Sequence, residues 1–331
     1  MHFIKDFEQT KKDLIKLFRS NKPIFIARLG GNETDLVRRY IILKNLVGNE
    51  ENNTNKLIEQ LNKDKEFIDL SKSIKKYAGF YDTKNDINNI IKFCELYIKG
   101  CKNCDATSFS NAFLLSYYFY DSSWQYYVNN NTKDQYDTMI SVIYKNNINI
   151  YDYTFFESVM PFLETFRYIA KDKKILILNS FSESIELQKK QLNKLINNYR
   201  FPNCTIITYK TPITYNENGK PFMSFPHNDF FETIENIQND IKVIDFDIAL
   251  LSCGAYSMFL GSFIKDTGKQ AIYIGGILQI YFGIMGSRFK TSFFESFLNK
   301  QTMLNEPVEK NQIIKNAMQN FDKNEGFSAY F

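Results

Sequence analysis

Residues 245–276, DFDIALLSCGAYSMFLGSFIKDTGKQAIYIGG, decide the fold. The apolar run 246–251 predicts a buried strand, and residues 256–268 predict a helix that ends at a glycine. A second apolar run, 270–274, predicts another buried strand. Two buried strands joined by one helix through short links are typical of a parallel sheet.

The same alternation of strand and helix begins near residue 171. KKILILNSF predicts a strand over 174–178 that ends on a polar turn, and the next eighteen residues predict a helix with Ser182 as its N-cap. CTIITYK predicts a further strand, and residues 228–241 predict a further helix. This alternation predicts an α/β fold, with a Rossmann-like, mostly parallel sheet covered by helices on both faces.

The first half of the chain is expected to be more helical. A helix over 4–20, a short buried strand over 24–27 and a helix over 33–46 come first, and further helical patterns reach residue 98. Residues 105–160 are rich in Tyr, Phe and Ser and give no clear period. We expect a single domain over residues 1–331, with a helical, aromatic-rich insertion at about 48–165, a regular β/α part at about 171–290 and a helical tail at 291–331.

Composition narrows the class of protein. The formal net charge of +4 on 331 residues is too small to indicate nucleic-acid binding. No apolar run reaches the length of about 18 residues that a transmembrane helix needs. Charges interrupt the first apolar residues, unlike in a signal peptide. We therefore expect a soluble cytoplasmic protein.

The cysteines do not indicate a disulfide framework or a zinc site. Cys101 and Cys104 form a CxxC motif, but zinc would need two more ligands, and His2 and His227 are the only histidines. Cys253 would need a neighbouring histidine to act as a nucleophile, and His227 lies in a separate predicted loop. Buried thiols are the favoured interpretation.

Polar turns follow four of the predicted strands. These turns are RLGGNE (28–33), NSFSES (179–184), SCGAYS (252–257) and GGILQIYFGIMGSRF (275–289). Ligands of an open parallel sheet bind beyond the carboxyl ends of its strands. Glycines there let backbone N–H groups approach a phosphate, and helix N-termini offer more of them. The four turns predict a site for a phosphate-bearing ligand.

Charged residues in these turns have two interpretations each. Arg28 can pair with Glu33 or Asp35, or its forked guanidinium can grip a diphosphate. Glu33 can cap the helix that it begins, or act as a base or metal ligand. Arg288 can be a solvated cation or a ligand contact. The chain contains neither GxGxxG nor GxxxxGK[ST], which argues against a dehydrogenase and a P-loop protein.

Several segments together resemble one family. RLGGNE resembles the R-F-G-D-G-E segment of glycosyltransferases with the GT-D fold, in which an Asp-x-Glu pair holds the metal on a nucleotide-sugar diphosphate. Residues 77–106 are similar to the segment that follows in bacterial polysaccharide-cluster proteins of this type, and KKILILNSFSESIELQ resembles their K-V-L-V-I-H-P-F-x-E-S-I. Residues 245–289 resemble their D-x-A-L-I-G-C-G-A-Y-G and G-G-x-x-Q-x-x-F-G-I-K-G-x-R-W. The resemblance covers most of residues 22–290 and implies a GT-D-like fold.

The chain departs from this family at the metal. Gly31 stands where the family has Asp, so the Mn²⁺ or Mg²⁺ that the resemblance implies would have one protein carboxylate, Glu33, with Asp35 one turn away. Asn179 replaces a histidine and Phe289 a tryptophan. The positions that match are Arg28, Gly30, Glu183, Ser184, Cys253, Gly254, Tyr256, Gly275, Gly276, Gln279, Gly283, Gly286 and Arg288.

The resemblance implies a glycosyltransferase that moves a sugar from a nucleotide-diphosphate sugar to a surface-glycan acceptor, free or lipid-linked. Arg28 and Glu33 would be catalytic, with Glu33 either the general base or the remaining metal ligand. The residues expected to bind the nucleotide sugar are Gly30, Gly31, Asn179, Ser182, Glu183, Cys253, Gly254, Tyr256, Gly275, Gly276, Gln279 and Arg288. Two alternatives stay open: a non-catalytic nucleotide- or glycan-binding homologue, favoured by Gly31, and a pyruvyl- or phospho-transferase acting on the same polysaccharide.

Overall fold

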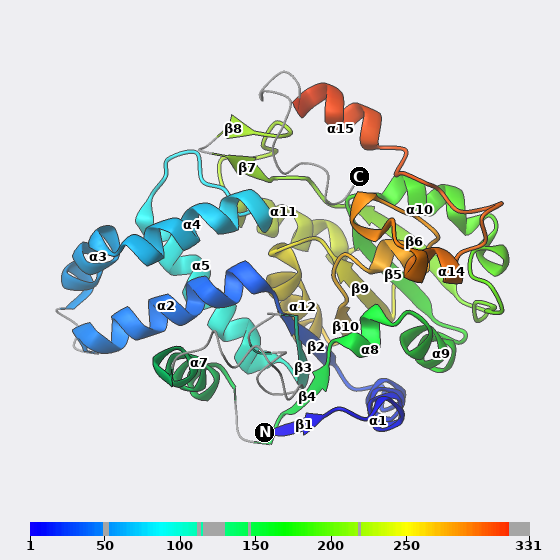
Figure 1. The fold of residues 1–331 in the computed structure, drawn as a ribbon, viewed down its shortest axis with the longest axis horizontal. Coiled ribbons are helices and arrows are strands. Elements are labelled where there is room, and N and C mark those ends of the chain that lie inside the picture. The colour runs from blue at the N-terminus through cyan, green and yellow to red at the C-terminus, as the bar shows by residue number, and fades with distance from the viewer. Residues whose placement is uncertain (49–52, 111–113, 115–129, 145–146, 218–219, 318–331) are drawn as a thin grey trace.

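The protein is built on one parallel β-sheet (Figure 1). A computed structural model describes residues 1–48, 53–110, 114, 130–144, 147–217 and 220–317. In this part of the chain the sheet has eight strands in the order β1-β4-β3-β2-β10-β9-β5-β6, and every neighbouring pair is parallel. The strands are β1 (His2–Ile4), β2 (Ile24–Leu29), β3 (Ala106–Phe109), β4 (Asn149–Asp152), β5 (Lys174–Asn179), β6 (Thr205–Lys210), β9 (Ile248–Ser252) and β10 (Gln270–Tyr273).

Helices cover both faces of the sheet, as the sequence predicts. One core contains Phe25, Ala27 and Leu29 of β2, and the other contains Ile24 and Ile26, because successive side chains of a strand point to opposite faces. The first core is covered by α2 (Gly31–Val47), α3 (Thr54–Lys63), α4 (Lys65–Tyr77), α5 (Ile87–Asn103), α7 (Asn130–Ile143), α11 (Phe230–Lys242) and α12 (Tyr256–Asp266). The second core is covered by α1 (Phe7–Arg19), α8 (Thr154–Glu157), α9 (Met160–Ile169), α10 (Ser182–Lys189) and α13 (Leu278–Tyr281).

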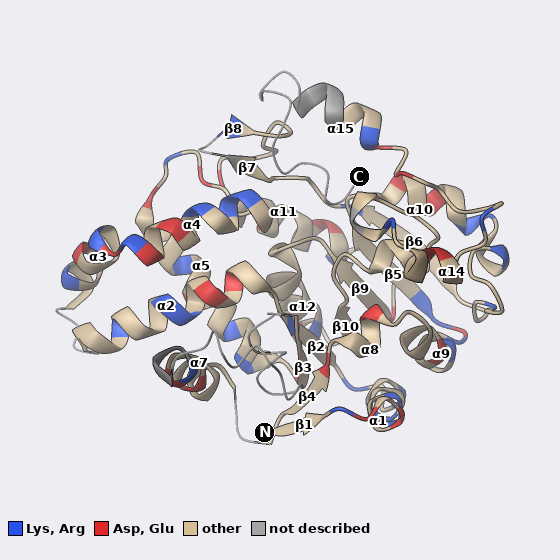
Figure 2. Cartoon of the chain, viewed as in Figure 1, with Lys and Arg blue, Asp and Glu red and all other residues tan. Residues whose placement is uncertain are grey.

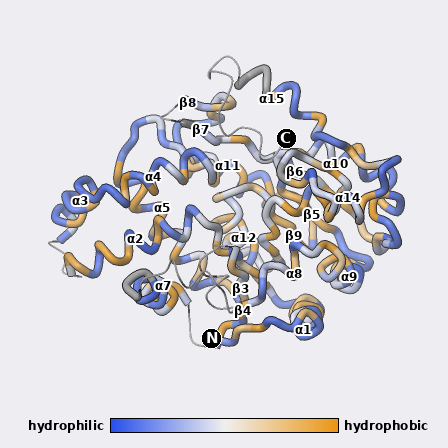
Figure 3. Tube along the Cα trace, in the orientation of Figure 1, coloured by the Kyte–Doolittle hydropathy of each residue, from blue (hydrophilic) through white to orange (hydrophobic). Residues whose placement is uncertain are grey.

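Small elements complete the described fold. They are the hairpin β7 (Asn216–Glu217) and β8 (Lys220–Pro221), the 3₁₀ turns η3 (Leu192–Lys194) and η4 (Ser287–Phe289), and the C-terminal helices α14 (Ser292–Phe297) and α15 (Lys310–Ala317). Figure 3 shows hydrophobic residues gathered around the central strands, and Figure 2 shows charges of both signs along the outer helices α3 and α4. None of the described helices has the length and apolar character needed to cross a membrane.

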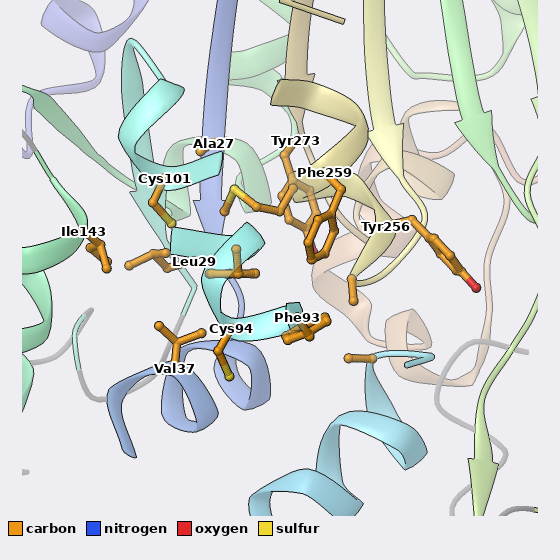
Figure 4. Close-up of a cluster of buried hydrophobic side chains, with 14 of the residues drawn as sticks. Ala27, Leu29, Val37, Phe93, Cys94, Cys101, Ile143, Tyr256, Phe259 and Tyr273 are labelled. Atoms are coloured by element: carbon orange, nitrogen blue, oxygen red, sulfur yellow. The ribbon is translucent and has the colours of Figure 1, made fainter. Parts of the chain in front are cut away.

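The first core also accounts for the CxxC motif. Cys101, at the end of α5, is 1% exposed and lies among the packed side chains of Figure 4, near Leu29 and Val37. Burial raises the pKa of its thiol well above the ordinary value. Cys104 is also buried, and its Sγ donates to the Cys101 carbonyl at 3.1 Å. Both thiols are packing groups.

The structure departs from the predicted elements in the N-terminal half. A strand, β1, precedes the first helix, which begins at Phe7 rather than at residue 4. The predicted helical region 48–165 also contributes β3 and β4 to the sheet, in addition to its helices. These strands have three or four residues, too few to show a period of two, and their pairing with distant strands defines them.

Candidate functional site

A cavity of about 270 Å³ lies at the carboxyl edge of the sheet, where β2, β10, β9 and β5 end as neighbours. All four polar turns that the sequence singles out contribute to its wall. The proposed site residues that line it are Arg28, Gly30, Gly31, Glu33, Asn179, Cys253, Gly254, Tyr256, Gly275, Gly276 and Gln279. Ser182 and Glu183 are not among the lining residues. Arg288 lies in η4, and its side chain is outside the described part of the structure.

Arg28 is held in this cavity by contacts with β3 and with two aromatic rings. Its Nε donates to Ser110 Oγ at 2.7 Å, and the Ser110 hydroxyl donates to the Leu29 carbonyl at 2.9 Å. The guanidinium carbon lies 4.8 Å from the ring centroid of Tyr153 and 5.2 Å from that of Tyr273. Cation–π contacts of this kind stabilise a partly desolvated arginine. A fixed guanidinium of this kind has the geometry that can bind two oxygens of a phosphate group.

The turn after β10 lies directly against that guanidinium. Gly275 has a φ of +81°, and a Cβ at this residue would overlap Nη1 of Arg28. The Gly275 N–H donates to the Leu251 carbonyl at 3.1 Å, which ties the turn to β9. Gly275 is therefore required both for its backbone conformation and for the space that Arg28 occupies.

Glu33 lies in the first turn of α2, and its carboxylate is only 6% exposed. It packs over Gly30, where a Cβ would stand 2.5 Å from Oε2 of Glu33. Burial raises the pKa of the Glu33 carboxyl above its ordinary value, while its own backbone N–H and the charge of Arg28 act in the opposite direction. A carboxyl with a raised pKa beside a fixed cation is suited to act as a general base.

The residues around Glu33, at the start of α2, do not form a complete metal-binding site. Gly31 supplies no ligand atom, and a Cβ there would have no heavy atom within 4 Å. The carboxylate of Asp35 accepts a hydrogen bond from the Tyr136 hydroxyl, and Asp35 does not line the cavity. Within the described residues no group of three or more His, Cys, Asp or Glu side chains is placed to hold a metal ion. Mn²⁺ or Mg²⁺ would have Glu33 as its one carboxylate ligand, too few for a protein-held site.

The turn between β9 and α12 is fixed to the end of α4. Gly254 has a φ of +57°, and a Cβ there would lie 2.8 Å from the Ala78 carbonyl oxygen. The same carbonyl accepts a hydrogen bond from the Ala255 N–H at 3.0 Å. On the other side, the Tyr273 hydroxyl donates to the Gly254 carbonyl at 3.1 Å. These contacts bring the residues that follow α4 into the cavity wall.

Cys253 is a wall residue rather than a nucleophile. Its side chain is 6% exposed, and burial raises the pKa of its thiol to about 12. The nearest hydroxyl is that of Ser257, 3.3 Å from Sγ. His227 does not line this cavity, and its Nδ1 lies 3.0 Å from Thr233 Oγ1. The thiol therefore stays protonated near neutral pH, and the side chain that contacts it among the described residues is the Ser257 hydroxyl, which is not a base.

The start of α10 differs from the sequence expectation. The N-cap is Phe181 rather than Ser182. The N–H groups of Glu183 and Ser184 donate to Oε1 of Glu309 at 2.9 and 3.1 Å, and the Ser184 hydroxyl donates to its other oxygen. The side chain of Glu183 pairs with Lys210. The positive end of this helix thus holds a carboxylate of the chain itself.

A second cavity of about 680 Å³ lies beside the first, beyond the end of β6. Ser180, Pro212 and Ile213 line both cavities. Glu183 and Glu309 line only the second one. The loop before α11 and the segment that begins α15 complete its wall.

Gln279 presents an unused hydrogen-bond donor to the first cavity. It lies in α13, is 1% exposed, and its Nε2 has no hydrogen-bond partner among the described residues. A buried amide without a protein partner costs free energy, so this group is suited to donate to a water molecule or a ligand oxygen. Tyr256, in contrast, is engaged inside the protein: its ring stacks on Phe230 with centroids 4.4 Å apart, and its hydroxyl lies 2.8 Å from Thr214 Oγ1.

Several residues of the site could not be identified from the sequence. Ser110 follows β3, a strand that the sequence pattern does not reveal, and it positions Arg28. Tyr77 and Gly79 come from the end of α4, and Thr214 and Tyr215 from the loop after β6. None of these residues follows a predicted strand directly. A partial signal exists for Tyr77 and Gly79 alone, in the YAG sequence at 77–79 whose glycine ends a helix.

No family model and no curated protein matches the chain. Two solved structures of the domain of unknown function 1792 are similar to it, each with 12% sequence identity and a TM-score of 0.43. The alignments cover 94% of this chain and 93% or 94% of the other. One of them is the selenomethionine-substituted structure, and the other is described as having a distinct glycosyltransferase fold.

Proposed function

We propose that this protein is a glycosyltransferase that takes its sugar from a nucleotide-diphosphate sugar, in a GT-D-like arrangement. The observation that carries this proposal is the position of Arg28. Its guanidinium is fixed by Ser110 and two rings, lies against Gly275, and shares one cavity with the buried carboxyl of Glu33. A fixed cation can stabilise the leaving diphosphate, and a general base in the same cleft can take the proton of the acceptor hydroxyl.

In this reaction the bond between the anomeric carbon and the diphosphate oxygen breaks, and the acceptor oxygen bonds to that carbon. Glu33 takes the proton of the acceptor hydroxyl. Arg28 binds the diphosphate and stabilises the negative charge that develops on its leaving oxygen. The Nε2 of Gln279 donates to an oxygen of the donor. The acceptor is a hydroxyl of a surface glycan, free or lipid-linked.

Titration calorimetry with UDP, GDP, CDP and ADP tests which nucleoside diphosphate the sugar donor contains. Inorganic pyrophosphate is included as the fragment that lacks the nucleobase. We expect one nucleoside diphosphate to bind, and Arg28→Ala to weaken that binding. Lys22→Ala is the control, since Lys22 is an exposed cation outside the cavity. If the wild-type protein binds none of these compounds, with or without Mn²⁺, the proposal is wrong.

A second candidate function is binding without catalysis. The observation that favours it is Gly31, which removes one carboxylate from the family's metal pair. Release of free sugar from a panel of nucleotide sugars distinguishes the two functions. Slow hydrolysis that Glu33→Gln abolishes establishes an enzyme, whereas tight binding with no hydrolysis and no transfer establishes a binding protein.

A further inference from the structure

An exposed aromatic side chain stands in the wall of the first cavity. Tyr77 is the last residue of α4, and its side chain is 50% exposed. The other large hydrophobic side chains that are exposed in the described residues do not line this cavity: Met1, Leu46, Tyr168, Leu187, Val243, Phe293 and Val308. The Lys76 ammonium lies 5.6 Å from the centroid of this ring. The exposed part of the ring stands in the wall of a polar cleft, where a flat ligand group can pack on it.

Tyr77 is placed there by the backbone that follows it. The Ala78 carbonyl accepts the Ala255 N–H at 3.0 Å, and the Gly79 carbonyl accepts the Thr214 hydroxyl at 2.6 Å. Gly79 has a φ of +84°, which ends the helix. The backbone that follows Tyr77 is therefore fixed relative to the turn at Gly254, so this end of the helix is not free.

The spacing along the sheet matches a nucleoside diphosphate. Arg28 is on β2 and Gly254 follows β9, and β10 lies between these strands. Two inter-strand spacings amount to about 10 Å. A diphosphate bound at Arg28 and Gly275 can extend its ribose across the end of β10 and bring its base to the turn at Gly254. Ala78, the next residue after Tyr77, contacts this turn, and Tyr77 lines the same cavity.

We propose that Tyr77 is the platform on which the base of the nucleoside diphosphate stacks, an inference that rests on the proposed function. Base–aromatic stacking needs only the face of the ring. Tyr215 borders the turn at Gly254, with its hydroxyl 3.6 Å from the position of a Cβ on Gly254, and it also lines the cavity. The site then has two parts: Arg28 binds the diphosphate, and Tyr77 binds the base.

The test compares a ligand that has a base with one that lacks it. The dissociation constants of inorganic pyrophosphate and of the tightest-binding compound among UDP, GDP, CDP and ADP are measured for the wild type and for Tyr77→Ala. We expect the nucleotide to bind about 5- to 150-fold more weakly to the variant, the range that alanine substitution of a stacking residue gives. Pyrophosphate is expected to bind equally well to both proteins.

Two further variants make the result specific. Tyr77→Phe keeps the ring and is expected to bind the nucleotide as the wild type does. Tyr168→Ala removes a ring that is 48% exposed and lies outside the cavity, and it is expected to change nothing.

The inference is overturned if Tyr77→Ala leaves the affinity for the nucleotide unchanged, or if it weakens the binding of nucleotide and pyrophosphate equally. It is also overturned if the wild type binds pyrophosphate and binds no nucleotide more tightly than pyrophosphate. If the wild type binds neither pyrophosphate nor any nucleotide, the proposed function itself fails. The pyrophosphate measurement thus separates the two failures.

Discussion

The guanidinium of Arg28 fills the space that a side chain at Gly275 would need. The two residues are more than two hundred positions apart in sequence, and the pairing of β2 with β10 brings them together. The arginine and the glycine turn therefore form one unit of the cavity, in which neither position tolerates a change without affecting the other.

Gly275→Ala is expected to impair ligand binding as well as stability. An alanine at this φ destabilises the fold by about 1–2 kcal/mol. Its Cβ also displaces Nη1 of Arg28, so we expect pyrophosphate to bind about 10- to 100-fold more weakly, as for the loss of a charged hydrogen bond. Gly268→Ala is the matched control, because Gly268 has a φ of +88° and no neighbour within 4 Å of a Cβ. Chemical denaturation should show that Gly268→Ala is destabilised by a similar amount, and calorimetry should show that it binds pyrophosphate as tightly as the wild type. Equal affinity of the two variants would contradict the coupling of Arg28 to Gly275.

The central strands of this fold are readable from the sequence because they are buried on both faces. The predicted strands at 24–27, 174–178, 246–251 and 270–274 correspond to β2, β5, β9 and β10 within one or two residues at each end. Such strands appear as continuous apolar runs that end at polar turns. The edge of the sheet is different. β1 has three residues, and its parallel pairing with β4 depends on contacts across the fold, so no local pattern reveals it.

The site was predictable to the extent that strand ends define it. The rule that ligands bind beyond the carboxyl ends of parallel strands places Arg28, Glu33, Gly254 and Gly275 at one edge, and all four line one cavity. The contacts between segments that are distant in the sequence could not be predicted in this way. The end of α4 reaches the cavity only because Ala78 bonds to the turn after β9, and this contact joins residues far apart in the sequence.

Glu33→Gln is expected to abolish turnover without weakening the binding of the nucleoside diphosphate. General base catalysis contributes about 100- to 10,000-fold, so hydrolysis or transfer of a nucleotide sugar should fall by that factor. The affinity for the nucleoside diphosphate should not decrease, because the substitution removes a negative charge near the phosphates. Release of the nucleoside diphosphate is the measurement. Glu59→Gln is the control, since Glu59 is an exposed carboxylate of α3 that does not line the cavity. A Glu33→Gln variant with the wild-type rate would show that Glu33 is not the base.

The stability of the wild type is expected to fall with rising pH because of Glu33. Burial raises the pKa of this carboxyl in the folded protein, so the folded state binds a proton more tightly than the unfolded state. The contribution is complete below the unfolded pKa of about 4.3, and it is lost as the pH rises through the folded pKa. The loss amounts to about 1.4 kcal/mol for each pKa unit of the shift.

Urea denaturation of the wild type and of Glu33→Gln between pH 4 and pH 8 measures this effect. The glutamine does not titrate, so the stability of the variant relative to the wild type should increase over this range and then level off. A difference that is independent of pH would show that the Glu33 pKa is not raised by folding. A difference that changes in the opposite direction would show that Arg28 stabilises the ionised form by more than burial opposes it.

Gly31→Asp is expected to build the metal ligand that the turn lacks. Gly31 is the first residue of α2, and a Cβ there meets no heavy atom within 4 Å, so the aspartate fits without strain. A carboxylate in the first turn of a helix adds about 0.3–1 kcal/mol of stability through the helix dipole, partly offset by repulsion from Glu33. Two carboxylates with the oxygens of a bound diphosphate make a set that Mn²⁺ accepts. We therefore expect Mn²⁺ to tighten nucleotide binding by the variant much more than by the wild type, in calorimetric titrations with and without the ion.

Gly31→Asn, with the same shape and no charge, should show little of this effect. If Mn²⁺ acts equally on all three proteins, the turn at Gly31 does not face the diphosphate, and the placement of the ligand along this edge is wrong.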